Sequence, residues 1–346
     1  MISPQELRDR IDRLPRVSLA HLPTPLEELP RLSAALGGPR IFIKRDDCTG
    51  LAFGGNKARH NEFILGRALE EGADTLVWGA GIQSNNCRQT AAAAAKLGLE
   101  CHLVLTTDHA EMEFQGNFLL DHLVGARIEL NSEPMGPPLW NKIKEKSDSL
   151  RDEGKRVFTI ADPPSRFAAS VSYTGALVEL RDQLDEQNVR ADAVYFSSSG
   201  STGAGMFLGR KLLQWEAVLE AIMPIEWPFD TAEYMAKLAN GAAELMGLEP
   251  AVTLEDIQAS PDYIGAGYGI PTPEGLEAIS LLARQEGILL DPIYTGKAMG
   301  ALVADVRRGR WRKGQNLVFV HTGGTPALFY HHRDLAPMFD TAGKEG

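Results

Sequence analysis

The segment Val194-Tyr-Phe-Ser-Ser-Ser-Gly200-Ser-Thr-Gly-Ala-Gly205 joins an apolar run to a turn rich in hydroxyls and glycines, after which the sequence has helical patterning. We predict a strand over 193–196 and a helix over 202–215. The order of strand, glycine-rich turn and helix is typical of α/β proteins with parallel sheets. Backbone N–H groups at the start of such a helix attract anions, and the five hydroxyls among residues 197–202 favour a phosphate monoester over a simple tight turn. Walker A loops are excluded, because Met206 and Phe207 stand where that motif needs lysine and a hydroxyl.

The same alternation of apolar and helical segments continues along the chain. We predict further strands at 41–44, 75–78, 101–105, 127–130, 157–160 and 317–320, and further helices at about 59–71, 85–97, 140–153, 167–185, 230–246, 273–287 and 295–308. The 346 residues exceed the roughly 250–300 at which a single core usually divides, so two domains are expected. The predicted fold class is α/β, with two lobes of open, mostly parallel sheet covered by helices.

Composition and charge exclude several functions. The chain carries 35 Lys and Arg against 46 Asp and Glu, and the formal net charge of −11 argues against nucleic-acid binding and against a basic membrane surface. No apolar run reaches the roughly 18 residues of a membrane helix, and the charged start has no apolar signal-peptide core. The cysteines Cys48, Cys87 and Cys101 have no metal-type spacing and leave one unpaired in any disulfide scheme. We therefore expect a reduced, cytoplasmic protein without a metal site.

Two further glycine-rich stretches follow predicted strands. Gly79-Ala-Gly-Ile-Gln-Ser84 begins like a dinucleotide-binding motif but has serine at the sixth position, which disfavours a Rossmann site. Gly54-Gly-Asn-Lys57 places a lysine at a helix start, where the dipole and partial desolvation favour the neutral amine that a Schiff base requires. A reactive lysine together with a separate phosphate loop indicates pyridoxal 5'-phosphate. The alternative from another class is a phosphate- or nucleotide-binding protein without lysine chemistry.

Longer motifs surround these stretches. They are Ile41-Phe-Ile-Lys-Arg-Asp-Asp47, Leu51-Ala-Phe-Gly-Gly-Asn-Lys57, Gly81-Ile-Gln-Ser-Asn85, Gly200-Ser-Thr202, Tyr268-Gly-Ile-Pro-Thr-Pro-Glu274, Asp291-Pro-Ile-Tyr-Thr-Gly-Lys297 and His321-Thr-Gly-Gly-Thr-Pro-Ala327. In this order the chain resembles, over roughly residues 20 to 330, the D-cysteine desulfhydrase and 1-aminocyclopropane-1-carboxylate (ACC) deaminase family. That family belongs to the fold-type-II, tryptophan-synthase-β-like pyridoxal phosphate enzymes. The resemblance implies a larger cofactor-binding domain of residues 1–55 plus 165–346, a smaller domain of residues 56–164, and a homodimer.

The resemblance also implies residue roles. Lys57 would bind the cofactor's aldehyde and then move the substrate proton, and Asn85 would hydrogen-bond the cofactor's 3-oxygen. Tyr268 and Tyr294 would line the substrate face as catalytic residues. The residues implied to bind the cofactor's phosphate are Ser198, Ser199, Gly200, Ser201 and Thr202. Asn56, Thr295 and Thr322 would contact the rest of the cofactor, with Thr322 at its pyridine nitrogen. Ser84, Asn85 and Asn86 would bind the substrate, and Ser84 would also be catalytic.

Departures from the family pattern bear on the substrate. ACC deaminases have glutamate where this chain has Thr295 and leucine where it has Thr322, so the cofactor here would be a weaker electron sink. We therefore expect elimination of a sulfur leaving group from a small amino acid, D-cysteine first, giving pyruvate, ammonia and sulfide. ACC deaminase and L-cysteate sulfo-lyase are the alternatives. His60 replaces a lysine near the phosphate, Asn86 replaces histidine or glutamine, and Pro163-Pro-Ser165 replaces Gly-Gly-Ser at the substrate mouth.

Overall fold

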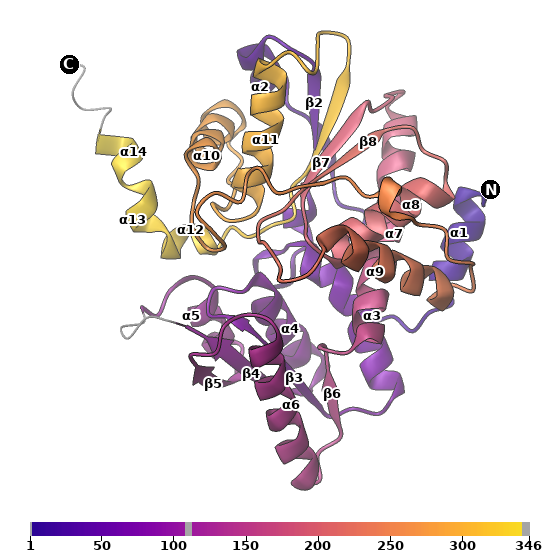
Figure 1. The fold of residues 1–346 in the computed structure, drawn as a ribbon, viewed down its shortest axis with the longest axis vertical. Helices are drawn as coiled ribbons and strands as arrows, with labels where there is room; N and C mark the ends of the chain where they lie inside the picture. Colours follow the sequence, from indigo (N-terminus) through magenta and orange to yellow (C-terminus); the bar gives the residue numbers. More distant parts are fainter. Residues whose placement is uncertain (1, 108–112, 341–346) are drawn as a thin grey trace.

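The computed structural model describes residues 2–107 and 113–340, which form an α/β protein built on two sheets (Figure 1). The larger sheet has the strand order β1 (Leu26–Glu28), β2 (Arg40–Lys44), β10 (Asn316–Val320), β7 (Ala193–Ser197), β8 (Val218–Ile222) and β9 (Ala259–Ser260). The smaller sheet has the order β5 (Arg127–Asn131), β4 (Glu100–Thr106), β3 (Thr75–Gly81) and β6 (Val157–Thr159). Every neighbouring pair is parallel except β1 with β2.

Helices cover both sheets. In chain order they are α1 (Pro4–Ile11), α2 (Pro30–Leu36), α3 (Asn56–Glu70), α4 (Asn85–Leu97), α5 (Gly116–Leu123), α6 (Pro137–Asp152), α7 (Pro163–Glu186), α8 (Ser201–Leu212), α9 (Thr231–Leu245), α10 (Pro273–Glu286), α11 (Thr295–Arg307), α12 (Ala327–Tyr330), α13 (His332–Leu335) and α14 (Pro337–Asp340). Short 3-10 turns lie at Asp46–Cys48, Leu51–Phe53 and Leu254–Asp256. No described helix is both long and apolar enough to cross a membrane.

The predicted fold class is confirmed, and each predicted strand and helix has a counterpart at its position. Sequence reasoning missed β1, β8, β9, α1, α2, α5 and α12 to α14. Strand β8 was hidden because Glu220 interrupts its apolar run, and the structure pairs that carboxylate with Arg310. Helix α7 starts earlier than predicted, at Pro163, because the Asp162 side chain caps it by accepting the Ser165 N–H at 3.1 Å.

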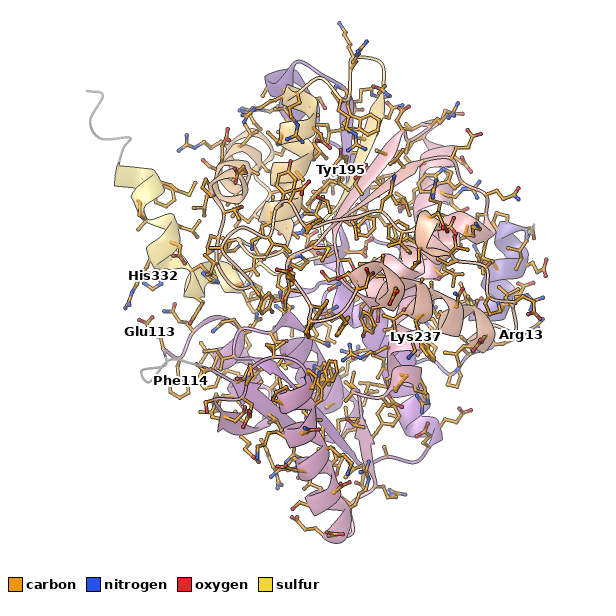
Figure 2. All side chains as sticks on the ribbon, in the orientation of Figure 1. Arg13, Glu113, Phe114, Tyr195, Lys237 and His332 are labelled. Carbon is orange, nitrogen blue, oxygen red and sulfur yellow. The ribbon has the colours of Figure 1, made fainter. Side chains whose placement is uncertain are left out.

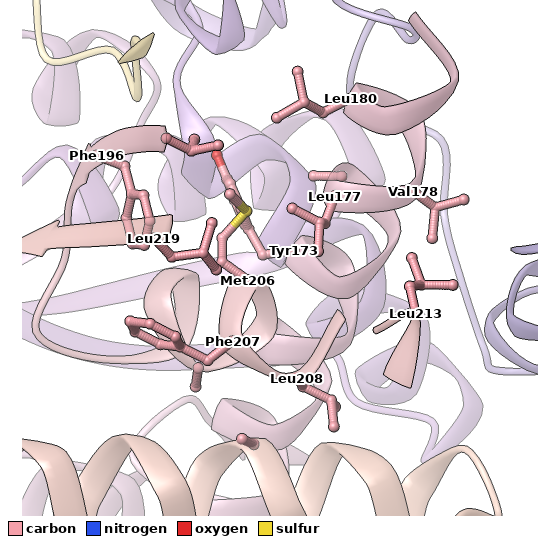
Figure 3. Close-up of a cluster of buried hydrophobic side chains, with 14 of the residues drawn as sticks. Tyr173, Leu177, Val178, Leu180, Phe196, Met206, Phe207, Leu208, Leu213 and Leu219 are labelled. Carbon is pink, nitrogen blue, oxygen red and sulfur yellow. The ribbon is translucent and has the colours of Figure 1, made fainter. Parts of the chain in front are cut away.

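The larger sheet is buried on both faces, as expected for parallel strands between two helical layers. Along β7, Val194 and Phe196 join one hydrophobic cluster, whereas the alternate residues Ala193 and Tyr195 join another. The first cluster packs the sheet against α7, α8 and α9 (Figure 3), and the second packs it against α2, α10 and α11. A third cluster fills the space around the smaller sheet.

The chain crosses between the sheets twice. It leaves β2 through the turns at 46–53, enters the smaller sheet by way of α3, and returns along α7 (Figure 1). This path places every strand of the smaller sheet between residues 75 and 159. The domain boundaries at 55/56 and 164/165 remain predictions. Because ligands of open parallel sheets bind beyond the carboxyl ends of the strands, the loops after β3, β7 and β10 mark the place to look for a site.

Candidate active site

The loops after β3, β7 and β10 line one cavity of about 220 Å³. It gathers 13 of the 14 residues predicted for the site, namely Asn56, Lys57, Ser84, Asn85, Asn86, Ser198, Ser199, Gly200, Ser201, Thr202, Tyr268, Tyr294 and Thr322. Thr295 is the exception and is fully buried outside the cavity lining. Among the described residues, the lining contains lysine, arginine and histidine but no aspartate or glutamate.

Lys57 is the second residue of α3, and its amine is prepared for nucleophilic chemistry. Burial, with a smaller contribution from the positive charge of Arg166, lowers the pKa of Lys57 to about 8. Compared with an ordinary lysine at 10.5, the neutral fraction at pH 7 rises by about 300-fold. The sequence predicted a neutral amine from the helix start, but the contribution of Arg166 was not visible there.

The turn before Lys57 is held by residues that sequence reasoning missed. Gly54 and Gly55 have φ angles of 66° and 124°, and a Cβ on Gly54 would lie 1.9 Å from the Asp47 carbonyl oxygen. Arg88 of α4 donates from Nη2 to the Gly54 carbonyl at 2.8 Å, and the Gln89 amide donates to the same oxygen. The helix that follows the Ser84 loop therefore also fixes the backbone that carries Lys57.

The loop after β7 forms a cradle with its own internal hydrogen bonds. The Ser198 hydroxyl accepts the Gly203 N–H at 2.8 Å and the Gly200 N–H at 3.2 Å. The Thr202 hydroxyl receives the Asn56 amide at 3.0 Å, which ties the loop to the start of α3. Ser197 lies on the cavity wall with a hydroxyl that has no partner among the described residues. Free hydroxyls and helix-start N–H groups at one place suit a phosphate dianion.

His60, the departure noted near the phosphate, lies in this cradle. Its Nε2 is 3.1 Å from the Thr202 hydroxyl, and its ring packs edge-on against Tyr173. Burial, reinforced by the charge of Lys57, lowers the pKa of His60 well below its ordinary value. His60 is therefore a neutral member of the cradle, whereas a lysine would bring a charge.

The loop after β3 is positioned to hold a carboxylate. Ser84 caps α4 by accepting the Cys87 N–H at 3.2 Å, so the positive end of that helix faces the cavity. Asn117 donates to the Asn85 side chain at 3.0 Å, and Thr90 donates to that of Asn86 at 3.3 Å. These contacts orient both amides without using their N–H donors.

Tyr268 and Tyr294, which also line the cavity, share a hydrogen bond between their hydroxyls, and burial raises the pKa of both phenols. Thr322 lines the cavity as well. The Thr295 hydroxyl instead donates to Asp291 Oδ2 at 2.6 Å. Contact of Thr295 with the cofactor stays a prediction.

These features fit one group. A lysine with a lowered pKa, a phosphate cradle with an unpartnered hydroxyl, and a carboxylate-holding helix start converge on one cavity. They define a site for an aldehyde cofactor that carries a phosphate and works on an amino acid.

Comparison of the chain with known proteins agrees with this assignment of the site. The chain belongs to the pyridoxal-phosphate dependent enzyme family, whose model matches residues 17–323. It is an enzyme with pyridoxal 5'-phosphate as cofactor and a fold-type-II architecture.

Individual relatives narrow the class. The chain is 39% identical over 329 residues to D-cysteine desulfhydrases of Klebsiella pneumoniae strain 342 and Klebsiella pneumoniae subsp. pneumoniae, covering 94% of this chain and 98% of each relative. A crystal structure described as an ACC deaminase homologue matches with a TM-score of 0.87 at 32% identity, covering 97% of this chain and 100% of that one. Escherichia coli diaminopropionate ammonia lyase in its apo form, at 14% identity and a TM-score of 0.66, covering 97% of this chain and 90% of that one, shares the fold.

Proposed function

We propose that this protein is a carbon–sulfur lyase that converts D-cysteine into pyruvate, ammonia and sulfide. The single observation that carries the proposal is the identity of 39% to D-cysteine desulfhydrases over nearly the whole length of both chains. The cavity supports it, because Lys57, the phosphate cradle and the Ser84 loop lie together on its wall.

The roles of the side chains follow from their positions. The Ser84 loop and the start of α4 hold the substrate carboxylate, which leaves the α-hydrogen within reach of the Lys57 amine. Lys57 removes that proton, and the Tyr268–Tyr294 pair supplies a phenol for proton transfer at the leaving sulfur. Pyridoxal phosphate, when bound, supplies the electron sink that stabilises the pair left on the α-carbon. The cradle at Ser198–Thr202 and Asn56 holds its phosphate.

The absence of carboxylates from the described cavity lining favours elimination over ring opening. An ACC deaminase has to break a carbon–carbon bond without a good leaving group, and it benefits from a strong electron sink. Here Thr322 is neutral, and the Thr295 hydroxyl donates its hydrogen bond to Asp291. Loss of sulfur from a β-carbon needs less assistance.

A keto-acid assay tests the proposal. The purified protein, loaded with pyridoxal phosphate, is given D-cysteine, L-cysteine, L-cysteate or ACC in turn. We expect pyruvate from D-cysteine and little or no 2-oxobutyrate from ACC. Robust 2-oxobutyrate release would overturn the proposal in favour of ACC deaminase, the second candidate that the 32% identical structure supports.

We further infer that the protein acts as a homodimer in the cytoplasm. Large apolar side chains, Phe114, Leu123, Phe329 and Phe339, are 63–70% exposed, and Figure 2 places Phe114, Glu113 and His332 on one flank. An ion pair between Arg333 and Glu113 ties α13 to that flank. The three cysteines are free thiols, which suits a reducing compartment. Light scattering at micromolar protein is expected to give twice the mass of 37.7 kDa; a monomer mass would contradict the dimer.

A further inference from the structure

Lys297 is a buried lysine that the proposed chemistry leaves unused. Its side chain has no exposed surface. Among the described residues its amine pairs with no carboxylate and donates instead to the Ile264 carbonyl at 2.7 Å and to the Gly267 carbonyl at 3.2 Å. Lys44, another buried lysine, is in contrast paired with the Glu179 carboxylate. Two backbone carbonyls of one segment therefore take the place of a counter-ion for Lys297.

The helix that carries Lys297 gives its charge little support. Lys297 is the third residue of α11, where the positive end of the helix dipole opposes an ammonium. Burial lowers the pKa of Lys297 to about 8, although the charge of Asp291 opposes the shift. The Asp291 carboxylate is itself engaged by the backbone N–H groups of Tyr294 at 2.7 Å and Thr295 at 2.9 Å. The hydrogen bonds that hold the Lys297 amine thus come from outside α11.

Both carbonyls belong to the segment of residues 261–272, which joins β9 to α10. It contains no helix and no strand, and Gly265, Gly267 and Gly269 adopt φ angles of 71°, 152° and 79°. The Gly267 carbonyl also accepts the Ile270 N–H, at a long 3.4 Å. Because glycines leave a backbone many conformations, a segment of this kind needs ties to fixed elements if it is to keep one of them. The buried amine of Lys297 is such a tie.

Tyr268 follows Gly267 directly and connects the segment to the cavity. Its hydroxyl shares a hydrogen bond with that of Tyr294, the residue at which α11 begins. Tyr268 also lines an adjoining hollow of about 360 Å³, so it belongs to the walls of both spaces. The start of α11 therefore fixes Tyr268 twice, through its hydroxyl and through the backbone just before it.

We propose that Lys297 is a positioning residue, which clamps the 261–272 segment through two carbonyls and so holds the Tyr268 phenol in the cavity. This rests on the proposed elimination, in which the Tyr268–Tyr294 pair transfers a proton at the leaving sulfur. Lys297 is not part of the described cavity lining and acts on the reaction through Tyr268. Without the clamp, the segment would move and the phenol would no longer be aligned with the leaving group.

Two substrates with different leaving groups test the clamp in the holoenzyme. The sulfur of D-cysteine departs faster when it receives a proton, whereas chloride departs from β-chloro-D-alanine without one. In Lys297→Met, kcat for D-cysteine should fall by about 100-fold with KM changed less than about threefold, because a phenol displaced by about 1 Å no longer meets the sulfur. The kcat for β-chloro-D-alanine should fall less than about fivefold. Equal losses on both substrates, or no loss on either, would overturn the proposal.

Two further variants complete this comparison. Lys297→Gln keeps an N–H donor and should recover part of the loss on D-cysteine. Lys44→Gln removes the charge of another buried lysine and should lower stability without separating the two substrates. If Lys297→Met does not fold, Lys297→Gln takes its place in every measurement, with the same signs expected.

Hydrogen exchange of the holoenzyme separates this inference from the proposed function. In Lys297→Met, amide exchange in peptides from 261–272 should speed up by about tenfold or more, while peptides from 197–202 and the Kd of pyridoxal phosphate should change less than about threefold. If the wild-type protein forms no pyruvate from D-cysteine but the exchange changes as expected, the elimination chemistry is wrong and the clamp stands. If pyruvate forms but the exchange of the segment is unchanged, or rises equally in all peptides, the clamp is wrong.

Discussion

The two ends of the cavity differ in how their polar groups are satisfied. At the phosphate end, the Thr202 hydroxyl bonds to the Asn56 amide and the His60 ring, and the Ser198 hydroxyl accepts two backbone N–H groups of its own loop, so that only the Ser197 hydroxyl has no partner among the described residues there. At the substrate end, the Arg166 guanidinium packs against the rings of Trp78 and Trp140 and has no hydrogen-bond partner among the described residues. A preorganised end binds its ligand without rearrangement, whereas open donors select whichever ligand completes them. We therefore expect the phosphate end to define the cofactor and the substrate end to define the specificity.

The largest effect should come from Lys57, which serves both ends. Lys57→Ala should lower turnover by about 10⁴-fold or more, because no other lysine lines the cavity among the described residues. The cradle should still bind pyridoxal phosphate, only more weakly. Lys297 is the informative competitor, since burial lowers its pKa to about 8 as well, although its amine donates to the Ile264 and Gly267 carbonyls. Borohydride reduction and peptide mapping should place the pyridoxyl mass on Lys57; a label on Lys297 would refute the assignment.

The next largest effect concerns the stability that the buried network around Asp46 gives to the fold. Asp46 is fully buried and accepts hydrogen bonds from Arg59 at 2.9 Å and Tyr173 at 2.6 Å. Asp46→Asn should reduce the free energy of unfolding by about 3–5 kcal/mol, because it leaves the Arg59 charge buried with one partner fewer. Denaturant titration measures this. An exposed pair offers the control, and Glu216→Gln, which faces Arg190 at the surface, should cost less than about 1 kcal/mol. Equal losses in both variants would contradict the role of the buried network.

Thr202 tests whether the cradle is a phosphate site or a turn. Thr202→Val removes a hydroxyl donor, and the Kd of pyridoxal phosphate should rise by about tenfold. Ser201→Ala should have a smaller effect, because that hydroxyl already donates to the Arg166 carbonyl. Fluorescence titration of the apoenzyme measures both. An unchanged Kd in Thr202→Val would mean that the loop only connects strand and helix.

The smallest expected effect is on the pH dependence of cofactor capture by Lys57. The Lys57 amine reacts when neutral, so cofactor capture by the apoenzyme should speed up as the pH rises to about 8 and level off above it. Arg166→Gln removes a repelling charge, raises the pKa of Lys57, and should shift the plateau to higher pH by up to about one unit. Stopped-flow absorbance across pH 6–10 follows the capture. A profile unchanged by Arg166→Gln would show that its charge does not reach Lys57.

Much of the fold and of the candidate cofactor site could be predicted from the sequence. The α/β class, the four strands of the smaller sheet and three strands of the larger one (β2, β7 and β10) follow from contiguous segments, and so do the predictions for Lys57 and the phosphate loop, because a strand, a glycine turn and a helix start are local patterns of a few residues. The longer motifs identified the family for the same reason. These motifs did not predict the orientation of the Thr295 side chain. Its hydroxyl donates to Asp291 because α11 begins at Thr295, which brings the two side chains together.

The tertiary structure alone decided the substrate end. Residues 78, 140 and 166 are far apart in the chain, and nothing local marks Arg166 as a cation without a carboxylate. Whether a guanidinium is paired depends on which distant side chains packing brings within about 4 Å of it. The same holds for Arg88 and Gln89, whose hydrogen bonds to Gly54 unite the substrate loop with the turn before Lys57. Local chemistry in the sequence therefore specified the cofactor, and long-range packing specified what the cofactor acts on.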